Sequence, residues 1–210
     1  MDRDDRPSVS PRMIYLASQS PRRQELLRQI DIEFDVLLPT TADEAHALEA
    51  LEARRGKESP RRYVERVTRL KLDAALKRMR ERKLPTRPVL TADTTVALGT
   101  MIYGKPEDAS DAERMLRELS GTTHRVLTAV AVGSLRRVVC AVSVSEVRFA
   151  PLTIRQIRDY IATREPFGKA GAYAIQGRAA AFVQSIKGSH SGIVGLPLHE
   201  TAALLSEFRR

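Results

Sequence analysis

Apolar residues recur along this chain with two spacings, which predict alternating strands and helices. Short apolar runs at residues 13–17, 33–38 and 88–98 have the length and composition of strands. Two longer runs, residues 124–132 and 138–149, follow a spacing of two and predict a hairpin with its loop between them. A further strand is expected at residues 180–186, after the glycine-containing stretch 168–177.

Helical spacing connects these strands. Helices are expected in five segments, namely residues 21–30, 61–83, 110–120, 153–161 and 196–208. In the longest, one buried face is predicted to contain Tyr63, Val67, Leu70 and Ala74. Capping residues are expected at Ser20, at Ser110 with Glu113, and at Thr153 with Gln156. Because the helices alternate with single strands and a hairpin, the pattern predicts an α/β protein with a mixed sheet.

Length and composition limit the organisation of the chain. The 210 residues suit one domain over residues 13–210, preceded by a charged tail at residues 1–12 that we expect to be disordered. No apolar run approaches the roughly 20 residues of a membrane helix, so no membrane association is expected. The lone Cys140 excludes an internal disulfide and fits a reducing compartment, which predicts a cytoplasmic protein.

The net charge of +9 is concentrated in one segment. Residues 53–87 contain 14 Lys or Arg but only 4 Asp or Glu. One interpretation is a nucleic-acid-binding regulator that uses the basic residues 54–87. The other is a solvated helix face, and it is favoured because Tyr63 is the segment's single aromatic residue, whereas single-strand binding surfaces interleave several.

The strand, turn and helix at residues 13–30 place hydroxyl and guanidinium groups together. Ser18, Ser20, Arg22 and Arg23 surround the expected helix start, where unpaired backbone N–H groups favour an anion. An ordinary capped helix with solvated arginines is the alternative. The stretch alone does not decide between a phosphate site and a plain helix start.

Further charged residues occur at the ends or inside apolar segments. Asp93 interrupts an apolar run, where a carboxylate is costly unless it meets a metal, a cation or hydrogen-bond donors. Lys71 lies beside the predicted buried face and either extends its amine to solvent or points into a cleft. Together with Glu44, Lys105 and Lys169, these groups suit phosphate chemistry with a divalent cation such as Mg²⁺.

Seven sequence segments resemble the Maf family of nucleotide pyrophosphatases, in the family's order. They are LASQSPRRQELL at residues 16–27, ADTTV at 92–96, GKP at 104–106, MLRELSGTTH at 115–124, EPFGKAGAYAIQG at 165–177, GS at 188–189 and VGLPL at 194–198. The resemblance implies a two-lobed α/β fold like that of inosine-triphosphate pyrophosphatases. In such a fold a mixed twisted sheet is flanked by helices and the substrate lies in a central cleft.

The same resemblance implies an activity. It is hydrolysis of a nucleoside triphosphate to the monophosphate and pyrophosphate with Mg²⁺ or Mn²⁺, and residues 169–177 are similar to the branch acting on dTTP and UTP. Roles in nucleotide-pool sanitation and in arrest of cell division are implied as well. The oligomeric state stays open, a homodimer included.

Residue by residue, Asp93 matches the family's proton acceptor, and Asp93 with Glu44 would hold the metal. The positions that match substrate-binding groups are Ser18, Arg22, Arg23, Lys71, Thr94, Lys105, Lys169 and Gln176. Of these, Arg22, Thr94 and Gln176 match positions tied to the choice of base.

Overall fold

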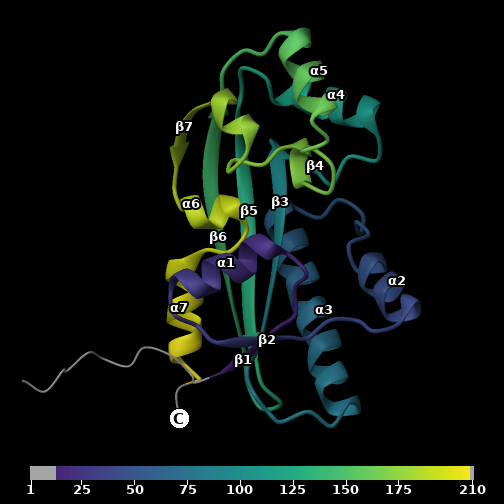
Figure 1. Ribbon diagram of the computed structural model, residues 1–210, viewed down its shortest axis with the longest axis vertical. Coiled ribbons are helices and arrows are strands. Elements are labelled where there is room, and N and C mark those ends of the chain that lie inside the picture. The colour runs from purple at the N-terminus through teal and green to yellow at the C-terminus, as the bar shows by residue number, and fades with distance from the viewer. Residues whose placement is uncertain (1–12, 209–210) are drawn as a thin grey trace, which may run out of the picture.

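The computed structural model describes residues 13–208 and arranges them around one mixed seven-stranded sheet (Figure 1). The strand order is β2-β1-β3-β5-β6-β7, and β4 pairs with β3 outside this path. β1 pairs in parallel with β2 and β3, while all other pairings are antiparallel. The strands are β1 (Ile14–Leu16), β2 (Phe34–Val36), β3 (Val89–Leu98), β4 (Met101–Tyr103), β5 (Thr123–Gly133), β6 (Val138–Phe149) and β7 (Val183–Lys187). The tail predicted at residues 1–12 lies outside the described residues.

Helices cover the sheet in separate groups. α3 (Pro60–Glu81) packs on one face, while α1 (Pro21–Gln29) and α7 (Leu198–Ser206) pack on the other (Figure 1). α4 (Ala109–Leu119) and α5 (Ile154–Ala162) cover the far end of the sheet. The remaining helical segments are α2 (Ala42–Ala50), α6 (His190–Val194) and the 3₁₀ turns η1 (Ala170–Ala172) and η2 (Arg178–Phe182).

Buried side chains divide into separate clusters at the two ends of the long strands. The α4 and α5 end has one large cluster centred on Leu116, Phe149 and Ile157, all of them fully buried. The other end has clusters on both faces of the sheet, formed by α1 and α7 on one side and by α3 on the other. Because β3, β5 and β6 run through both ends, the molecule has two lobes joined by a continuous sheet. The predicted two-lobed α/β fold is confirmed.

The buried face of α3 differs from the one predicted. Leu70 and Ala74 are only half-buried, whereas Leu72, Ala75 and Met79 are buried. The buried positions instead follow rows of every fourth residue, which drift around a helix as it crosses a twisted sheet. Lys71 occupies one such row, between Val67 and Ala75. Its side chain therefore faces the sheet rather than solvent.

Several local expectations also need correction. α4 is capped by Asp108, whose side chain accepts from the Asp111 backbone N–H at 2.8 Å, and not by Ser110. The helical spacing at residues 153–161 also predicts that Ile154, Ile157 and Ile161 face inward, but Ile154 is 38% exposed because it sits in the first turn of α5, outside the packed stripe. The strand expected from residue 180 begins at Val183, since the preceding residues form η2. The long hairpin and the Thr153 capping box are confirmed.

Basic residues of α3, together with Arg82 directly after it, hold the segment that precedes this helix. Arg66 donates to Glu58 and to the carbonyl of Leu51, and Arg78 and Arg82 both contact Glu44. These contacts tether α2, none of whose own residues is buried. The basic side chains that make these contacts thus have intramolecular partners. Within residues 13–208, no helix is both long and apolar enough to cross a membrane.

His124 is a buried base in the core of the α4 and α5 lobe. Its ring packs edge-on against Phe149 and Tyr173, and its Nε2 lies 2.8 Å from the Tyr173 hydroxyl. Its buried Nδ1 has no partner among the described residues. Burial lowers the pKa of His124 from 6.5 to about 4, because the imidazolium would lose its hydration.

We expect acid to destabilise the protein between pH 6.5 and about 4 through this residue. In that window the unfolded chain binds a proton that the folded chain excludes, so stability falls as pH falls and the loss is complete at the folded pKa. The expected loss is roughly 3 kcal/mol. Urea unfolding of wild type and His124→Gln across this range measures it, with the exposed His199→Gln as control. A His124→Gln protein that loses stability as steeply as wild type would contradict the assignment.

Candidate functional site

The site begins at a gap in the pairing of β3. On one edge β1 pairs with β3 only at Val89 and Leu90, and β4 pairs with the same strand only from Val96 onward. Between these contacts, residues 92–95 have no strand partner on this edge within the described chain. Asp93 and Thr94 lie in this gap, and both are less buried than the residues before and after them.

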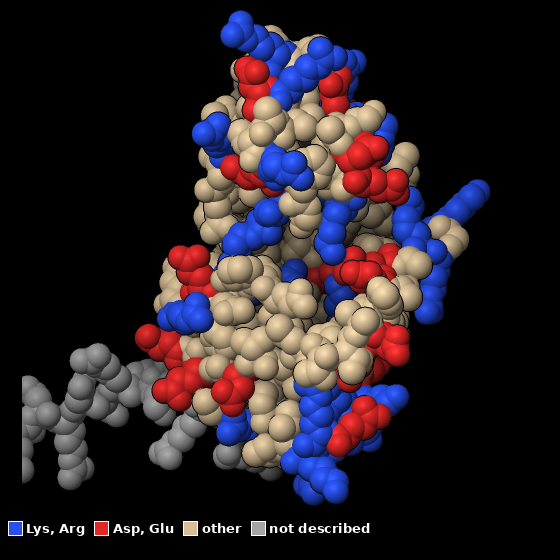
Figure 2. Space-filling view, turned by 45° about the vertical axis from the view of Figure 1, so that its right-hand side comes forward, with Lys and Arg blue, Asp and Glu red and all other residues tan. Residues whose placement is uncertain are grey.

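A cavity of about 650 Å³ opens at this gap, between the two lobes. In Figure 2 the surface is hollowed at mid-height, with positive and negative side chains around the hollow. Five predicted cations line the cavity, namely Arg22, Arg23, Lys71, Lys105 and Lys169. Ser18, Asp93 and Thr94 line it too. Its size and concave shape are those of a small-molecule site.

The carboxylate of Asp93 is part of an ion-pair cluster. Lys71 Nζ lies 2.7 Å from Asp93 Oδ1 and 2.7 Å from Glu52 Oε1. Lys105 Nζ contacts the other oxygen of Glu52 at 3.3 Å. Burial raises the pKa of Glu52, but the two lysines outweigh it and hold the pKa below its ordinary value. Two carboxylates thus converge on one point of the cavity, which Lys71 Nζ occupies.

Arg23 connects three separate segments at the cavity. Its Nε donates to the carbonyl oxygen of Gly195 at 2.8 Å, and its two terminal nitrogens donate to Ser18 Oγ and Thr94 Oγ1 at 3.3 Å each. Thr94 Oγ1 also lies 2.9 Å from Thr128 Oγ1. Burial lowers the pKa of Arg23, opposed by the charge of Asp93. The fork of one guanidinium fixes the β1–α1 turn, β3 and the α6–α7 link relative to one another.

Arg22 behaves differently from its neighbour. It lines the cavity, and its guanidinium makes no hydrogen bond to another residue among 13–208. Burial lowers its pKa, and burial followed by the charge of Arg22 lowers the pKa of Lys169. Cations whose charge is so disfavoured gain most from an anionic ligand. Arg22 and Lys169 are therefore placed to bind phosphate oxygens.

Two predicted site residues lie elsewhere. Glu44 contacts Arg78, Arg82 and the Thr40 backbone N–H, and it does not line the cavity. Arg78 lies about two turns beyond Lys71 on α3, and Arg82 follows the end of this helix, so Glu44 does not share a ligand with Asp93 in this arrangement. Gln176 is exposed and is absent from the cavity wall, where Tyr173, Ala174 and Ile175 take part instead. Its role in base selection stays a prediction.

Glu52 is the main site residue that the sequence did not indicate. It belongs to the polar stretch before α3, which contains several glutamates and no apolar periodicity to orient them. Its position is fixed by tertiary contacts: the Tyr63 hydroxyl donates to its carbonyl at 2.9 Å, and Arg66 binds the carbonyls on either side. Only the tethering of this stretch to α3 brings Glu52 to Asp93.

The cavity combines two surfaces of different chemistry. Cations and hydroxyls cluster around the start of α1 and the middle of β3, which suits a polyphosphate. An apolar wall contains Val96, Val126, Ile175 and Ile193, which suits a planar ring. The carboxylates of Asp93 and Glu52 lie beside the cations. This arrangement can hold a charged, ring-containing ligand and place an acidic oxygen beside its phosphates.

Comparison with known proteins gives matches along nearly the whole chain. A family model described as Maf-like protein matches residues 13–208. The dTTP/UTP pyrophosphatase of Albidiferax ferrireducens is 58% identical over 195 residues, which cover 93% of this chain and 96% of the relative. The protein of the same name from Polaromonas sp. is 59% identical, with coverages of 91% and 94%. A third, from Ralstonia nicotianae, is 59% identical with coverages of 96% and 97%. A solved structure of a HAM1 protein from Coxiella burnetii gives a TM-score of 0.49 at 16% identity, covering 93% of this chain and 98% of that chain.

Proposed function

The chain belongs to the family of Maf-like proteins, and we propose that it is a pyrophosphatase that hydrolyses dTTP and UTP to the monophosphate and pyrophosphate. The observation that carries the proposal is the cavity itself, in which Asp93 lies among the cations predicted to bind a triphosphate. Relatives that bear this name are identical to the chain at more than half of the aligned positions. Modified pyrimidine nucleotides have the same ring and phosphates, and we include them in the substrate class.

The residues of the cavity support separate roles for its cations, which bind the phosphates, and for Asp93, which accepts a proton. Arg22, Lys105 and Lys169 neutralise the phosphates and orient the chain of anhydride bonds. The carboxylate of Asp93 accepts a proton from water, the water oxygen forms a bond to the α-phosphorus, and the bond from that phosphorus to the bridging oxygen breaks. The electron pair leaves with the bridging oxygen on pyrophosphate, whose negative charge the lysines stabilise.

A divalent cation fits the two carboxylates of the cavity. Asp93 and Glu52 already surround one positive charge, the amine of Lys71, each at 2.7 Å. Among the described residues no group of three or more His, Cys, Asp or Glu could form a complete metal cage. Mg²⁺ is commonly held by one or two carboxylates together with substrate phosphates. We therefore propose Asp93 and Glu52 as its protein ligands, with Glu52 in place of Glu44; when bound, the ion would add positive charge at the phosphates.

The nucleic-acid alternative is not supported. Arg66, Arg78 and Arg82 hold the segment before α3 through Glu44, Glu58 and backbone carbonyls. The relatives named above are enzymes acting on free nucleotides, as their names state. The basic segment therefore contributes to the construction of the cavity. We further propose a cellular role in nucleotide-pool sanitation, which the activity would serve by converting pyrimidine triphosphates to their monophosphates.

The proposal predicts pyrophosphate release from dTTP and UTP in the presence of Mg²⁺ or Mn²⁺. Purified protein is incubated with dTTP, UTP, 7-methyl-GTP, ATP and GTP, and pyrophosphate and orthophosphate are measured separately. We expect the two pyrimidine substrates to give pyrophosphate, and we expect a chelator to abolish its release. Orthophosphate as the first product would contradict the assigned bond. Release from 7-methyl-GTP but neither pyrimidine would contradict the substrate.

A further inference from the structure

The apolar wall of the cavity includes a backbone stretch that is hydrogen-bonded to a residue outside the cavity. Tyr173, Ala174 and Ile175 line the cavity. The backbone N–H of Ala174 donates to the Tyr160 hydroxyl at 3.3 Å. That hydroxyl donates in turn to Glu165 Oε1 at 2.9 Å. The wall is thus bound to α5 through a single phenol oxygen.

The carboxylate of Glu165 also binds the backbone further along, at the end of the segment 174–178. Glu165 Oε2 accepts from the backbone N–H of Arg178 at 3.1 Å. Gly177 packs directly on the carboxylate, and a Cβ at this position would lie 2.1 Å from Oε1. Any side chain at Gly177 would therefore displace Glu165. One Tyr–Glu pair consequently holds both Ala174 and Arg178, at the two ends of a five-residue segment.

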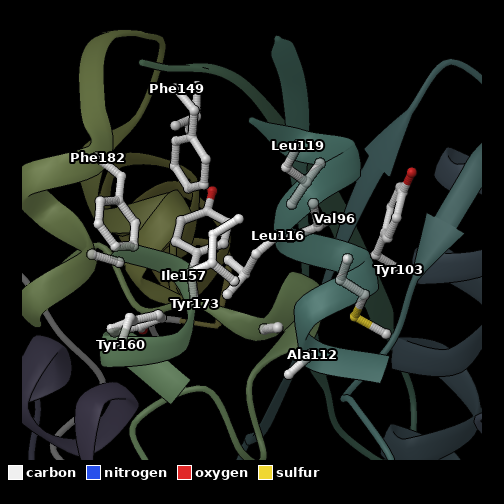
Figure 3. Packing of buried hydrophobic residues seen from close by; sticks show 14 of the residues in the cluster. Val96, Tyr103, Ala112, Leu116, Leu119, Phe149, Ile157, Tyr160, Tyr173 and Phe182 are labelled. Atoms are coloured by element: carbon white, nitrogen blue, oxygen red, sulfur yellow. The ribbon is translucent and has the colours of Figure 1, made fainter. Parts of the chain in front are cut away.

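The anchor is itself immobilised by the core. Tyr160 is 3% exposed, and its ring packs edge-on against Phe182 with centroids 5.3 Å apart. Figure 3 shows Tyr160 of α5 in the same group of buried side chains as Phe182 and Tyr173. Burial, reinforced by the bond to Glu165, raises the pKa of the Tyr160 hydroxyl, which therefore stays protonated as a donor. Neither Tyr160 nor Glu165 lines the cavity.

We propose that Tyr160 and Glu165 are positioning residues that set the place of the nucleobase wall and thereby the preference for pyrimidines, an inference that rests on the proposed function. The cations lie at the side of the cavity that would bind the phosphates, so the nucleobase would contact the apolar wall. A purine is larger than a pyrimidine, and a wall held at a fixed place excludes the larger ring by steric contact. A wall free to shift outward loses this exclusion and binds the pyrimidine less well.

A single-atom change tests the inference. Tyr160→Phe removes the hydroxyl that joins Ala174 to Glu165. We expect the KM for dTTP and UTP to rise about fivefold, kcat to stay within about twofold, and discrimination against ATP and GTP to fall by a similar factor. The matched control is Tyr103→Phe, which removes a hydroxyl bound to Glu118 at 2.7 Å in the same core cluster but away from the cavity. Equal kinetics in the two variants would overturn the inference.

A second readout does not depend on turnover. Amide hydrogen exchange is measured at Ala174 and Arg178 in wild type, Tyr160→Phe, Glu165→Gln and Tyr103→Phe. We expect faster exchange at Ala174 in Tyr160→Phe, faster exchange at Arg178 in Glu165→Gln, and no change at either amide in Tyr103→Phe. Unchanged protection in all variants would overturn the positioning role even if wild type hydrolyses both pyrimidines. If the variants alter the protection but wild type hydrolyses neither dTTP nor UTP, the proposed function is overturned and the positioning role is not.

Discussion

Replacing Asp93 with Asn is expected to lower the turnover of dTTP about a thousandfold while the fold stays intact. Asn keeps the shape of the side chain but loses the charge that accepts a proton or binds a cation. Lys71 retains its 2.7 Å contact with Glu52, so the substitution leaves no buried charge without a partner. The melting temperature should therefore change little, whereas kcat should fall, so that saturating substrate does not restore the rate.

Steady-state kinetics and thermal unfolding of Asp93→Asn check this expectation together. The control is Asp73→Asn, which removes an exposed carboxylate from α3 and should leave both measurements at the wild-type level. Retention of more than about a tenth of wild-type kcat would exclude Asp93 from proton transfer, since general-base groups contribute more than this. A large drop in melting temperature would show that Asp93 is needed for the fold instead.

Asp93 was predictable as a site residue from the sequence, whereas its contact with Lys71 was not. A carboxylate inside an apolar strand is unusual enough to predict a special environment, and the structure supplies one in the gap between β1 and β4. Lys71 was ambiguous, because helical spacing places it beside a buried face without saying what that face meets. The row of buried residues on α3 depends on how the helix crosses the sheet, and this information is tertiary.

The acidic partner of Asp93 was beyond prediction for a similar reason. Glu44 and Glu52 occupy one polar stretch, and no hydrophobic period distinguishes them. Their positions are decided by which arginine or lysine each one meets: Glu44 meets Arg82, and Glu52 meets Lys71. Elements with strong periodicity, such as the β5–β6 hairpin, were predictable because their pattern is local. Long-range ion pairs leave no such pattern.

Arg23→Lys is expected to lower both the stability and the activity of the protein, and to do more damage than a lysine at any other arginine of the cavity. Lysine keeps the positive charge but presents one ammonium, which cannot reach Gly195, Ser18 and Thr94 with the geometry of the guanidinium fork. Loss of these contacts should cost about 2 kcal/mol of stability, which corresponds to a melting temperature lower by roughly 4–8 °C. Because the fork also aligns β3 with the start of α1, kcat/KM should fall about a hundredfold.

The other two arginines of α1, Arg22 and Arg28, serve as comparisons for the Arg23→Lys variant. Arg28→Lys, on the exposed side of α1, should change neither stability nor activity, since within residues 13–208 its guanidinium contacts only Gln24 and the ring of Phe34 at the surface. Arg22→Lys should weaken substrate binding without lowering the melting temperature, because its guanidinium bonds to no other described residue. An Arg23→Lys protein that matches Arg22→Lys in both measurements would show that Arg23 binds substrate and does not brace the cavity. The two adjacent arginines would then share one role, contrary to the different contacts that the structure gives them.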